Sequence, residues 1–141
     1  MVFVLAHPLV LPLLAMVGLT LLVWVRLYWV RLPEMRRAKI DPQRLAGSAD
    51  KHLLKDTRAS DNFINLFEVP VLFYVLVLAT IQAGVHDAAL FGLAWAFVGF
   101  RGLHSLIQCS YNRVVHRFIA YVLATLALFA YLGRLAWVLV V

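Results

Sequence analysis

The sequence predicts an all-α membrane protein, built as an up-down bundle of four transmembrane helices. Three observations lead to this fold class. First, 64% of the 141 residues are apolar and 14% are charged, whereas soluble domains have roughly 45–50% apolar and 25% charged residues. Second, the apolar residues form four long runs, and about 20 helical residues cross a bilayer core about 30 Å thick. Third, the connections between the later runs are short, and short connections join antiparallel neighbours.

The four predicted spans account for most of a single domain over residues 1–141. The first run carries one charge, Arg26, at its end, where a long side chain can snorkel to the headgroups. No Lys or Arg precedes this run, and it is longer than the apolar part of a signal peptide, so we interpret it as a span. The predicted spans are residues 9–28, 63–83, 88–109 and 118–137, with a polar segment at residues 30–61.

The basic residues predict how the chain lies in the membrane. The formal charge is +6, but the Lys and Arg residues lie between apolar runs, which is typical of membrane orientation and not of nucleic-acid binding. They are concentrated in the first and third connections, so both termini are expected outside the cytoplasm. Arg134 has no role in this scheme. The basic residues of the two connections are Arg31, Arg36, Arg37, Lys39, Arg44, Lys51, Lys55, Arg58, Arg113 and Arg117.

Other classes of protein and site are excluded by what the sequence contains. The single cysteine, Cys109, cannot form an internal disulfide, and the Gly and Pro residues show no collagen-like period. No close His, Cys and carboxylate pattern predicts a metal site, and there is no phosphate-binding loop or nucleophile elbow. Cys109 lies at a membrane edge, where we interpret it as a small apolar residue and not as a nucleophile.

Polar residues recur on one face at the start of the second span. They fall at offsets 0, 3, 4, 7 and 10, which keeps them within about a third of the circumference of a helix. Arg58 and Asp61 also fit a solvated helix start. Asn65 and Glu68 lie inside the apolar run and need partners. The full set is Arg58, Asp61, Asn62, Asn65 and Glu68.

Two further polar clusters lie on the third span and at the start of the fourth. Intramembrane polar residues indicate function by default, because each is costly to insert. The third-span cluster has the same offsets and consists of Arg101, His104, Ser105, Gln108 and Tyr111. The fourth-span cluster consists of Arg113, His116, Arg117 and Tyr121. Arg113 also fits a simple membrane anchor, whereas Arg117 and Tyr121 are i, i+4 neighbours that can contact one ligand. Together these cations predict a water-soluble anionic ligand beside a lipid-accessible wall.

The run RASDNFINLFEVP, from Arg58 to Pro70, resembles the MAPEG superfamily, the membrane-associated proteins in eicosanoid and glutathione metabolism. The resemblance covers essentially the whole chain, including the number of spans, the basic first connection and the polar third helix. It points to a bacterial-type microsomal glutathione transferase. It therefore implies a homotrimer in a bacterial inner membrane, with glutathione between neighbouring subunits near the cytoplasmic face. The residues themselves do not separate this membrane from the endoplasmic reticulum.

The resemblance also implies roles for single residues. Arg58 and Asn62 look like the family's glutathione-contacting Arg and Asn. The family's Glu, three residues after that Asn, is replaced here by Asn65, so either Glu68 substitutes from the next turn or the acidic contact is lost. His104 and Gln108 fall where the family has His or Tyr and then Tyr. Arg101 is a further candidate for glutathione binding. The first helix supplies one more basic contact, with Arg31, Arg36 and Arg37 as candidates.

Arg117 and Tyr121 are spaced like the arginine and tyrosine of the prostaglandin E synthase and microsomal glutathione transferase branch. That arginine is proposed to stabilise the glutathione thiolate. Phe118 replaces the serine of the synthase, so the isomerase chemistry of that enzyme is not implied. A free thiol has a pKa near 8.5, and a nearby guanidinium favours the nucleophilic thiolate. We expect Arg117 to do this, with Tyr121 or His104 donating a supporting hydrogen bond.

These features predict a glutathione transferase or peroxidase that acts on a lipophilic electrophile from the bilayer. Arginines would bind the carboxylates of glutathione, and Glu68 or Asp61 would bind its ammonium group. A non-catalytic lipid-binding or scaffold protein is the alternative, and the departures at Asn65 and Gln108 favour it. A small drug exporter would use an intramembrane carboxylate, but the strong charge bias and long first connection of this chain argue against that class.

Overall fold

The computed structural model describes residues 7–46 and 53–141, and in this part of the chain all regular structure is helical. Lys51 of the predicted basic set lies outside the described residues. Four helical stretches are long and apolar enough to cross a membrane, which confirms the predicted fold class. The elements are α2 (Val10–Ala38), η1 (Pro42–Ala46), α3 (Arg58–Asn65), α4 (Val69–Gln82), α5 (Ala88–Cys109) and α6 (Val114–Val140).

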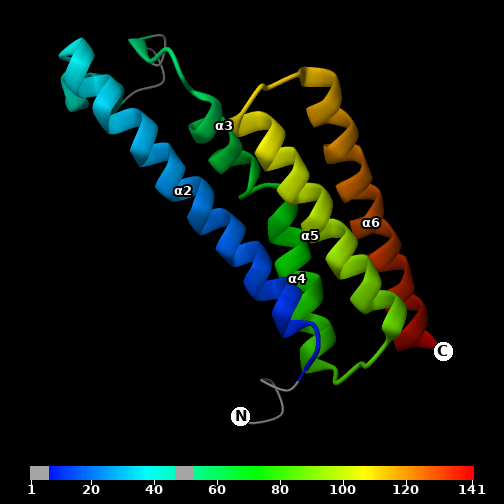
Figure 1. The fold of residues 1–141 in the computed structure, drawn as a ribbon. Helices are drawn as coiled ribbons and strands as arrows, with labels where there is room; N and C mark the ends of the chain where they lie inside the picture. The colour runs from blue at the N-terminus through cyan, green and yellow to red at the C-terminus, as the bar shows by residue number, and fades with distance from the viewer. Residues whose placement is uncertain (1–6, 47–52) are drawn as a thin grey trace.

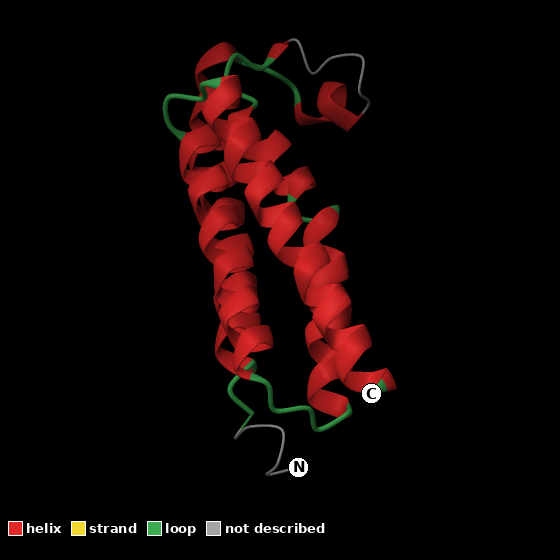
Figure 2. Ribbon diagram, turned by 90° about the vertical axis from the view of Figure 1, so that its right-hand side faces the viewer, coloured by secondary structure: helices red, strands yellow, loops and turns green. Residues whose placement is uncertain are grey.

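The helices form an elongated up-down bundle with two distinct ends (Figure 1). The connection from α2 to α3 and the turn from α5 to α6 lie at one end, which we call the basic end after its arginines. The start of α2, the connection from α4 to α5 and the C-terminus lie at the other, which we call the far end. Seen from the side, loops occupy the two ends, and one short non-helical stretch interrupts the bundle part-way along (Figure 2).

α2 continues well beyond the predicted span, which ended at residue 28. Its 29 residues give a length of roughly 43 Å at about 1.5 Å per residue, against a bilayer core of about 30 Å. The first part of the predicted polar segment is therefore helical. It is rich in Arg, Leu, Met and Ala, which favour helix. The single Pro33 removes one backbone donor without ending the helix. The helix ends at Ala38, and Lys39 caps it with a left-handed backbone (φ 52°).

The second span is broken, which corrects the prediction of one continuous polar stripe. α3 ends at Asn65 and α4 begins at Val69, with Leu66 to Glu68 between them. Pro70 has no backbone N–H and is tolerated in the first turn of a helix, so it marks a new start. Glu68 becomes the residue preceding α4, with a non-helical backbone, and its side chain is exposed. It therefore does not continue the helical face of Asn62 and Asn65.

The apolar core lies between α4, α5 and α6 and extends to the N-terminal half of α2. α5 and α6 pack against each other most extensively. Phe73 of α4 stacks on Phe97 of α5, with ring centroids 4.6 Å apart. Thr80 and Tyr131, both fully buried, join α4 to α6 through a 2.8 Å hydrogen bond. The core therefore holds the far half of the bundle together, whereas at the basic end polar contacts between helices accompany buried apolar residues such as Ile107 and Ala120.

The far end contains the partner of Arg134, whose role the sequence left open. Asp87 accepts a hydrogen bond from the backbone N–H of Leu90 and so caps the start of α5. Its second carboxylate oxygen accepts two hydrogen bonds from Arg134 of α6, the shorter at 2.7 Å. The hydrogen bonds from Arg134 hold the pKa of Asp87 below its usual value of 3.8. Arg134 therefore ties α6 to the start of α5.

Candidate functional site

Asn62 of α3 joins this helix to α5 at the basic end. Its side chain is 0% exposed. The side-chain oxygen of Asn62 accepts a hydrogen bond from Ser105 Oγ at 3.3 Å, and its Nδ2 donates to the sulfur of Cys109 at 3.5 Å. The distance from Ser105 is long for a hydrogen bond between two oxygen atoms, whereas the distance to Cys109 is ordinary because sulfur is a larger acceptor. In the folded chain, Asn62 therefore contacts α5 and not the exterior.

A second chain of hydrogen bonds runs from α3 through α5 to α6. The amide of Asn65 lies 3.2 Å from Oε1 of Gln108, and that atom lies 2.9 Å from Nε2 of His104. Nδ1 of His104 lies 3.0 Å from the backbone carbonyl oxygen of Arg117. His104 and Gln108 are buried, whereas Asn65 is half-buried. The predicted residues of three helices therefore meet, and they bond mainly to one another.

The direction of these hydrogen bonds follows from the chemistry of each group. A backbone carbonyl only accepts, so Nδ1 of His104 must carry the hydrogen that faces Arg117. In a neutral imidazole, Nε2 is then an acceptor and needs a donor from Gln108. Amide oxygen and nitrogen are assigned by their partners, so the Gln108 amide satisfies this need with its NH₂ turned toward His104. When the side-chain amide of Asn65 is rotated in the same way, its oxygen accepts a hydrogen bond from the same NH₂ group of Gln108.

Arg101 lies on α5 about one turn farther from the basic end than His104, and like Asn62 it is 0% exposed. Its Nη2 donates to the backbone carbonyl of Asn65 at 2.6 Å, at the end of α3. The guanidinium carbon lies 5.8 Å from the ring centre of Tyr121. A cation at the C-terminal end of a helix is favourable, because the last carbonyls have no helical donors. Arg101 therefore holds the break between α3 and α4, while its Nε and Nη1 have no hydrogen-bond partner among the described residues.

Arg58 stands at the outer rim of the cluster. It forms a salt bridge with Asp56 at 2.7 Å and donates to the backbone carbonyl of Ser110, so it joins the start of α3 to the end of α5. The hydrogen bonds from Arg58 hold the pKa of Asp56 below its usual value of 3.8. The Arg58 side chain is 39% exposed. It is therefore accessible to a ligand, with its charge partly balanced.

Arg117 and Tyr121 occupy the first two turns of α6, and both are half-buried. Nη1 of Arg117 donates to the side-chain oxygen of Asn112 at 2.9 Å. Asn112 lies in the turn between α5 and α6 with a positive φ of 50°, a conformation that Asn adopts more readily than most residues. No carboxylate of the described residues forms a salt bridge with Arg117. Its positive charge is therefore paired with a neutral amide.

Comparison with known proteins identifies the family. The sequence model of the MAPEG family matches residues 9–137, nearly the whole chain. This chain belongs to the MAPEG family. Searches of the curated proteins and of the solved structures found no match. Together with the four spans, membership makes this MAPEG chain a multi-pass integral membrane protein. It also associates the chain with glutathione or eicosanoid metabolism.

The remaining predicted residues of this MAPEG chain lie apart from the central cluster. Arg36 and Arg37 are exposed on the last turns of α2, and among the described residues they form no hydrogen bond or salt bridge with the cluster of α3, α5 and α6. Tyr111 lies past the end of α5 and is 3.1 Å from Nδ1 of His116 at the surface. Arg113 is exposed next to the turn. Within the described ranges, no three His, Cys, Asp or Glu residues form a metal-binding group.

Sequence reasoning missed two residues that position the cluster. Asn112 holds Arg117, and Asp56 holds Arg58. The signal for Asp56 was its place two residues before Arg58, which is typical of an aspartate that bonds the backbone and side chain of a helix start. The signal for Asn112 was an asparagine in a short turn between two apolar runs.

Proposed function

We propose that this protein binds glutathione at the basic end and transfers it to, or uses it to reduce, a lipophilic electrophile. The observation that carries the proposal is the half-buried Arg117, whose guanidinium bonds to the neutral oxygen of Asn112 and to no carboxylate of the described residues. A cation of this kind in a partly dehydrated site stabilises a thiolate. Membership in the MAPEG family supports glutathione as the source of the thiol.

The burial of each residue divides the cluster into two proposed roles. Arg58, Arg117 and Tyr121 are partly exposed and would contact glutathione directly, with the exposed Glu68 available to its ammonium group. The other predicted residues are positioning residues, because their polar atoms bond to neighbouring helices. These are Asn62, Asn65, Arg101, His104 and Gln108. In this scheme Tyr121 donates the supporting hydrogen bond to the thiolate.

The proposed assembly is a homotrimer in which glutathione lies between neighbouring chains. Arg31, Arg36 or Arg37 of an adjacent α2 would supply the additional basic contact. The electrophile would reach the sulfur from the bilayer, along a groove between adjacent chains. Because Lys and Arg are concentrated at the basic end, we propose that this end faces the cytoplasm and that both termini lie outside. The proposed location is a bacterial inner membrane.

The experiment is an ultraviolet difference spectrum of the glutathione thiolate, recorded as detergent-purified protein is titrated with glutathione at neutral pH. A saturable signal is expected for the wild type. An opposite charge within about 4–6 Å lowers an acid's pKa by about 1–3 units, so Arg117→Ala should abolish most of the signal. The trimer should remain intact by size-exclusion chromatography. Arg113→Ala is the matched control, because Arg113 is an exposed arginine at the same end.

Undiminished turnover in Arg117→Ala would reject the role given to that residue. A thiolate signal that falls equally in the two variants would show that general positive charge is responsible, and not the position of Arg117.

A non-catalytic lipid-binding or scaffold function is the second candidate. It is favoured by one observation: the side chains of His104 and Gln108 are already paired within the chain and are buried. If this function is correct, calorimetry will detect no glutathione binding, and a hydrophobic ligand will copurify. Binding of glutathione without a thiolate signal would show a protein that holds the tripeptide without activating it.

A further inference from the structure

The positive charge of Arg101 lies inside the bundle, and no described carboxylate forms a salt bridge with it. The side chain is 0% exposed, and its Nε and Nη1 have no hydrogen-bond partner among the described residues. Glu68 acts on it electrostatically, but that side chain is exposed, so water screens its charge. A guanidinium keeps its proton in a protein, so the charge of Arg101 remains.

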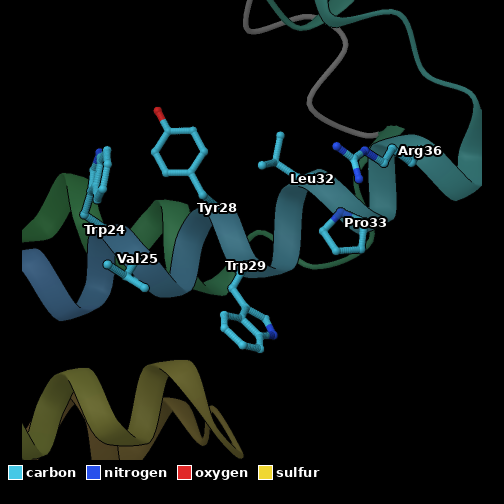
Figure 3. Close-up of a pocket in the computed structure, with 7 residues that line it drawn as sticks. All are labelled: Trp24, Val25, Tyr28, Trp29, Leu32, Pro33 and Arg36. Carbon is cyan, nitrogen blue, oxygen red and sulfur yellow. The ribbon is translucent and has the colours of Figure 1, made fainter.

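The single hydrogen bond from Arg101 to the carbonyl of Asn65 does not by itself require a charge, since a neutral donor could make it. Burying a cation is costly. Other cations of the basic end avoid this cost: Arg36, for example, lies past Leu32 and Pro33 beside an exposed groove on α2 (Figure 3). Salt screens an exposed charge of that kind, whereas the field of Arg101 acts through protein of low dielectric constant.

The ring of Tyr121 lies next to this buried charge. The guanidinium carbon of Arg101 is 5.8 Å from the ring centre of Tyr121, and the ring of His104 is 6.0 Å from it. His104 is neutral in the hydrogen-bonded chain, because Nδ1 donates to the carbonyl of Arg117 and Nε2 accepts from Gln108. Of these two α5 neighbours of Tyr121, Arg101 therefore carries the charge.

Tyr121 separates Arg101 from the proposed thiolate. The ring is half-buried, whereas Arg101 is enclosed by its own chain, so glutathione can contact the first and not the second. If Tyr121 donates a hydrogen bond to the thiolate, the sulfur lies roughly 10 Å from the guanidinium, given the 5.8 Å to the ring centre and ordinary hydrogen-bond lengths. With an effective dielectric constant of about 20, a unit charge at this distance changes the ionisation of a thiol by about one pH unit.

We propose that Arg101 stabilises the thiolate of bound glutathione through its charge, from behind Tyr121 and without contacting glutathione. Hydroxyl dipoles orient in the field of the protein, so the same charge turns the hydrogen of Tyr121 away from the guanidinium and toward the sulfur. Arg117 contacts the thiolate, and Arg101 is a positioning residue that adds a second, remote charge. This inference rests on the proposed function and identifies a further residue that supports its chemistry.

The pH dependence of the thiolate signal tests the proposal. The ultraviolet difference spectrum of bound glutathione is recorded over a range of pH for the wild type, Arg101→Gln and Arg101→Met. Both variants remove the charge, but only Gln can still donate to the carbonyl of Asn65. If the charge is responsible, both variants should raise the pH midpoint of the signal by about one pH unit.

S-methylglutathione separates this electrostatic effect from damage to the site, because its sulfur cannot ionise. Its affinity, measured by calorimetry, should stay within about twofold of the wild type in the Arg101 variants, since the side chain does not contact the ligand. If one variant fails to assemble as the wild type does, this comparison is made with the other. A structural role would instead weaken the binding of S-methylglutathione and of glutathione together.

Arg113→Gln is the matched control, because Arg113 is an exposed arginine at the same end. Its effect on the midpoint should be smaller and should disappear at about 1 M salt, where the Debye length is about 3 Å. The shift in the Arg101 variants should persist at that salt concentration, since the charge that they remove is buried.

Three outcomes would overturn the role of Arg101 alone. An unchanged midpoint in Arg101→Gln and Arg101→Met would show that the charge does not act on the sulfur. Different midpoints in the two variants, or a loss of S-methylglutathione affinity, would show that the contact with Asn65 is what matters. A shift that disappears at high salt would assign the effect to surface charge. A wild type without any thiolate signal would instead reject the proposed function, and this inference with it.

Discussion

Replacing Asn62 with Ala tests whether this residue holds the helices together or holds a ligand. The side chain is 0% exposed, and its two hydrogen bonds to α5 are 3.3 and 3.5 Å long. Side-chain hydrogen bonds between helices contribute about 0.6 kcal/mol each in membranes, and a truncated buried side chain adds a cavity cost. We therefore expect Asn62→Ala to lower the free energy of unfolding by about 1–2 kcal/mol.

The free energy of unfolding is measured in detergent micelles by titration with a denaturing detergent, with far-ultraviolet circular dichroism as the signal. Glutathione affinity of the folded variant is measured by calorimetry. Asp61→Ala is the matched control: Asp61 is adjacent on α3 but exposed, and it bonds only to the hydroxyl of Thr57 among the described contacts. An exposed substitution of this kind should change stability by about 0.5 kcal/mol or less.

The reasoning is refuted if Asn62→Ala unfolds like the wild type yet loses tenfold or more in glutathione affinity. That result would mean that Asn62 leaves α5 and contacts the ligand directly. If Asn62→Ala and the Asp61→Ala control are destabilised equally, the burial of Asn62 does not determine how much its side chain contributes to the free energy of unfolding.

Three other predictions follow from contacts in the bundle. Thr80→Val should lower the free energy of unfolding by about 1–3 kcal/mol, and Tyr131→Phe by about 0.5–1.5 kcal/mol, because only Thr80→Val leaves a buried hydroxyl, that of Tyr131, without a partner. Equal losses in a micelle unfolding experiment would contradict this. Asp87→Asn should lower the melting temperature at neutral pH, and the difference should narrow as the pH falls below 3.8, since protonation then removes the ion pair with Arg134 from the wild type as well. A pH-independent difference would exclude the ion pair as its cause. His104→Phe should lower the free energy of unfolding by about 1–3 kcal/mol, because it removes one buried and one partly buried hydrogen bond. An unchanged midpoint in the same unfolding titration would show that these bonds contribute nothing.

The sequence was sufficient for the number, order and alternating up-down arrangement of the spans, because apolar length in a bilayer leaves few alternatives. It also predicted which residues gather at the basic end: Asn65, Gln108, His104 and Arg117 were singled out by spacing, and they form one hydrogen-bonded chain. Spacing identifies the shared face of a helix, but it does not reveal what that face contacts. The prediction that these side chains line a ligand site stays a prediction, since the described bonds join them to one another.

Other features depended on contacts between residues far apart in the chain. The pair of Asp87 and Arg134 is separated by 47 positions, so Arg134 looked isolated in the sequence. The break before α4 had a local signal in Pro70, but a proline in an apolar run is also compatible with a continuous, kinked helix. The choice between the two depends on a donor that satisfies the freed carbonyl of Asn65, and that donor, Arg101, comes from another helix.

The break between α3 and α4 also determines how the second span can deform. A continuous helix transmits a sideways displacement along its backbone ladder, and a helix bends most readily where that ladder is interrupted. The interruption at Leu66 to Glu68 separates α3, which carries the polar residues, from α4, which carries Phe73 and Thr80 in the core. A displacement of α3 would therefore bend the span at this joint, opposed by the hydrogen bonds from α3 to α5, and it would not require the core packing of α4 to change.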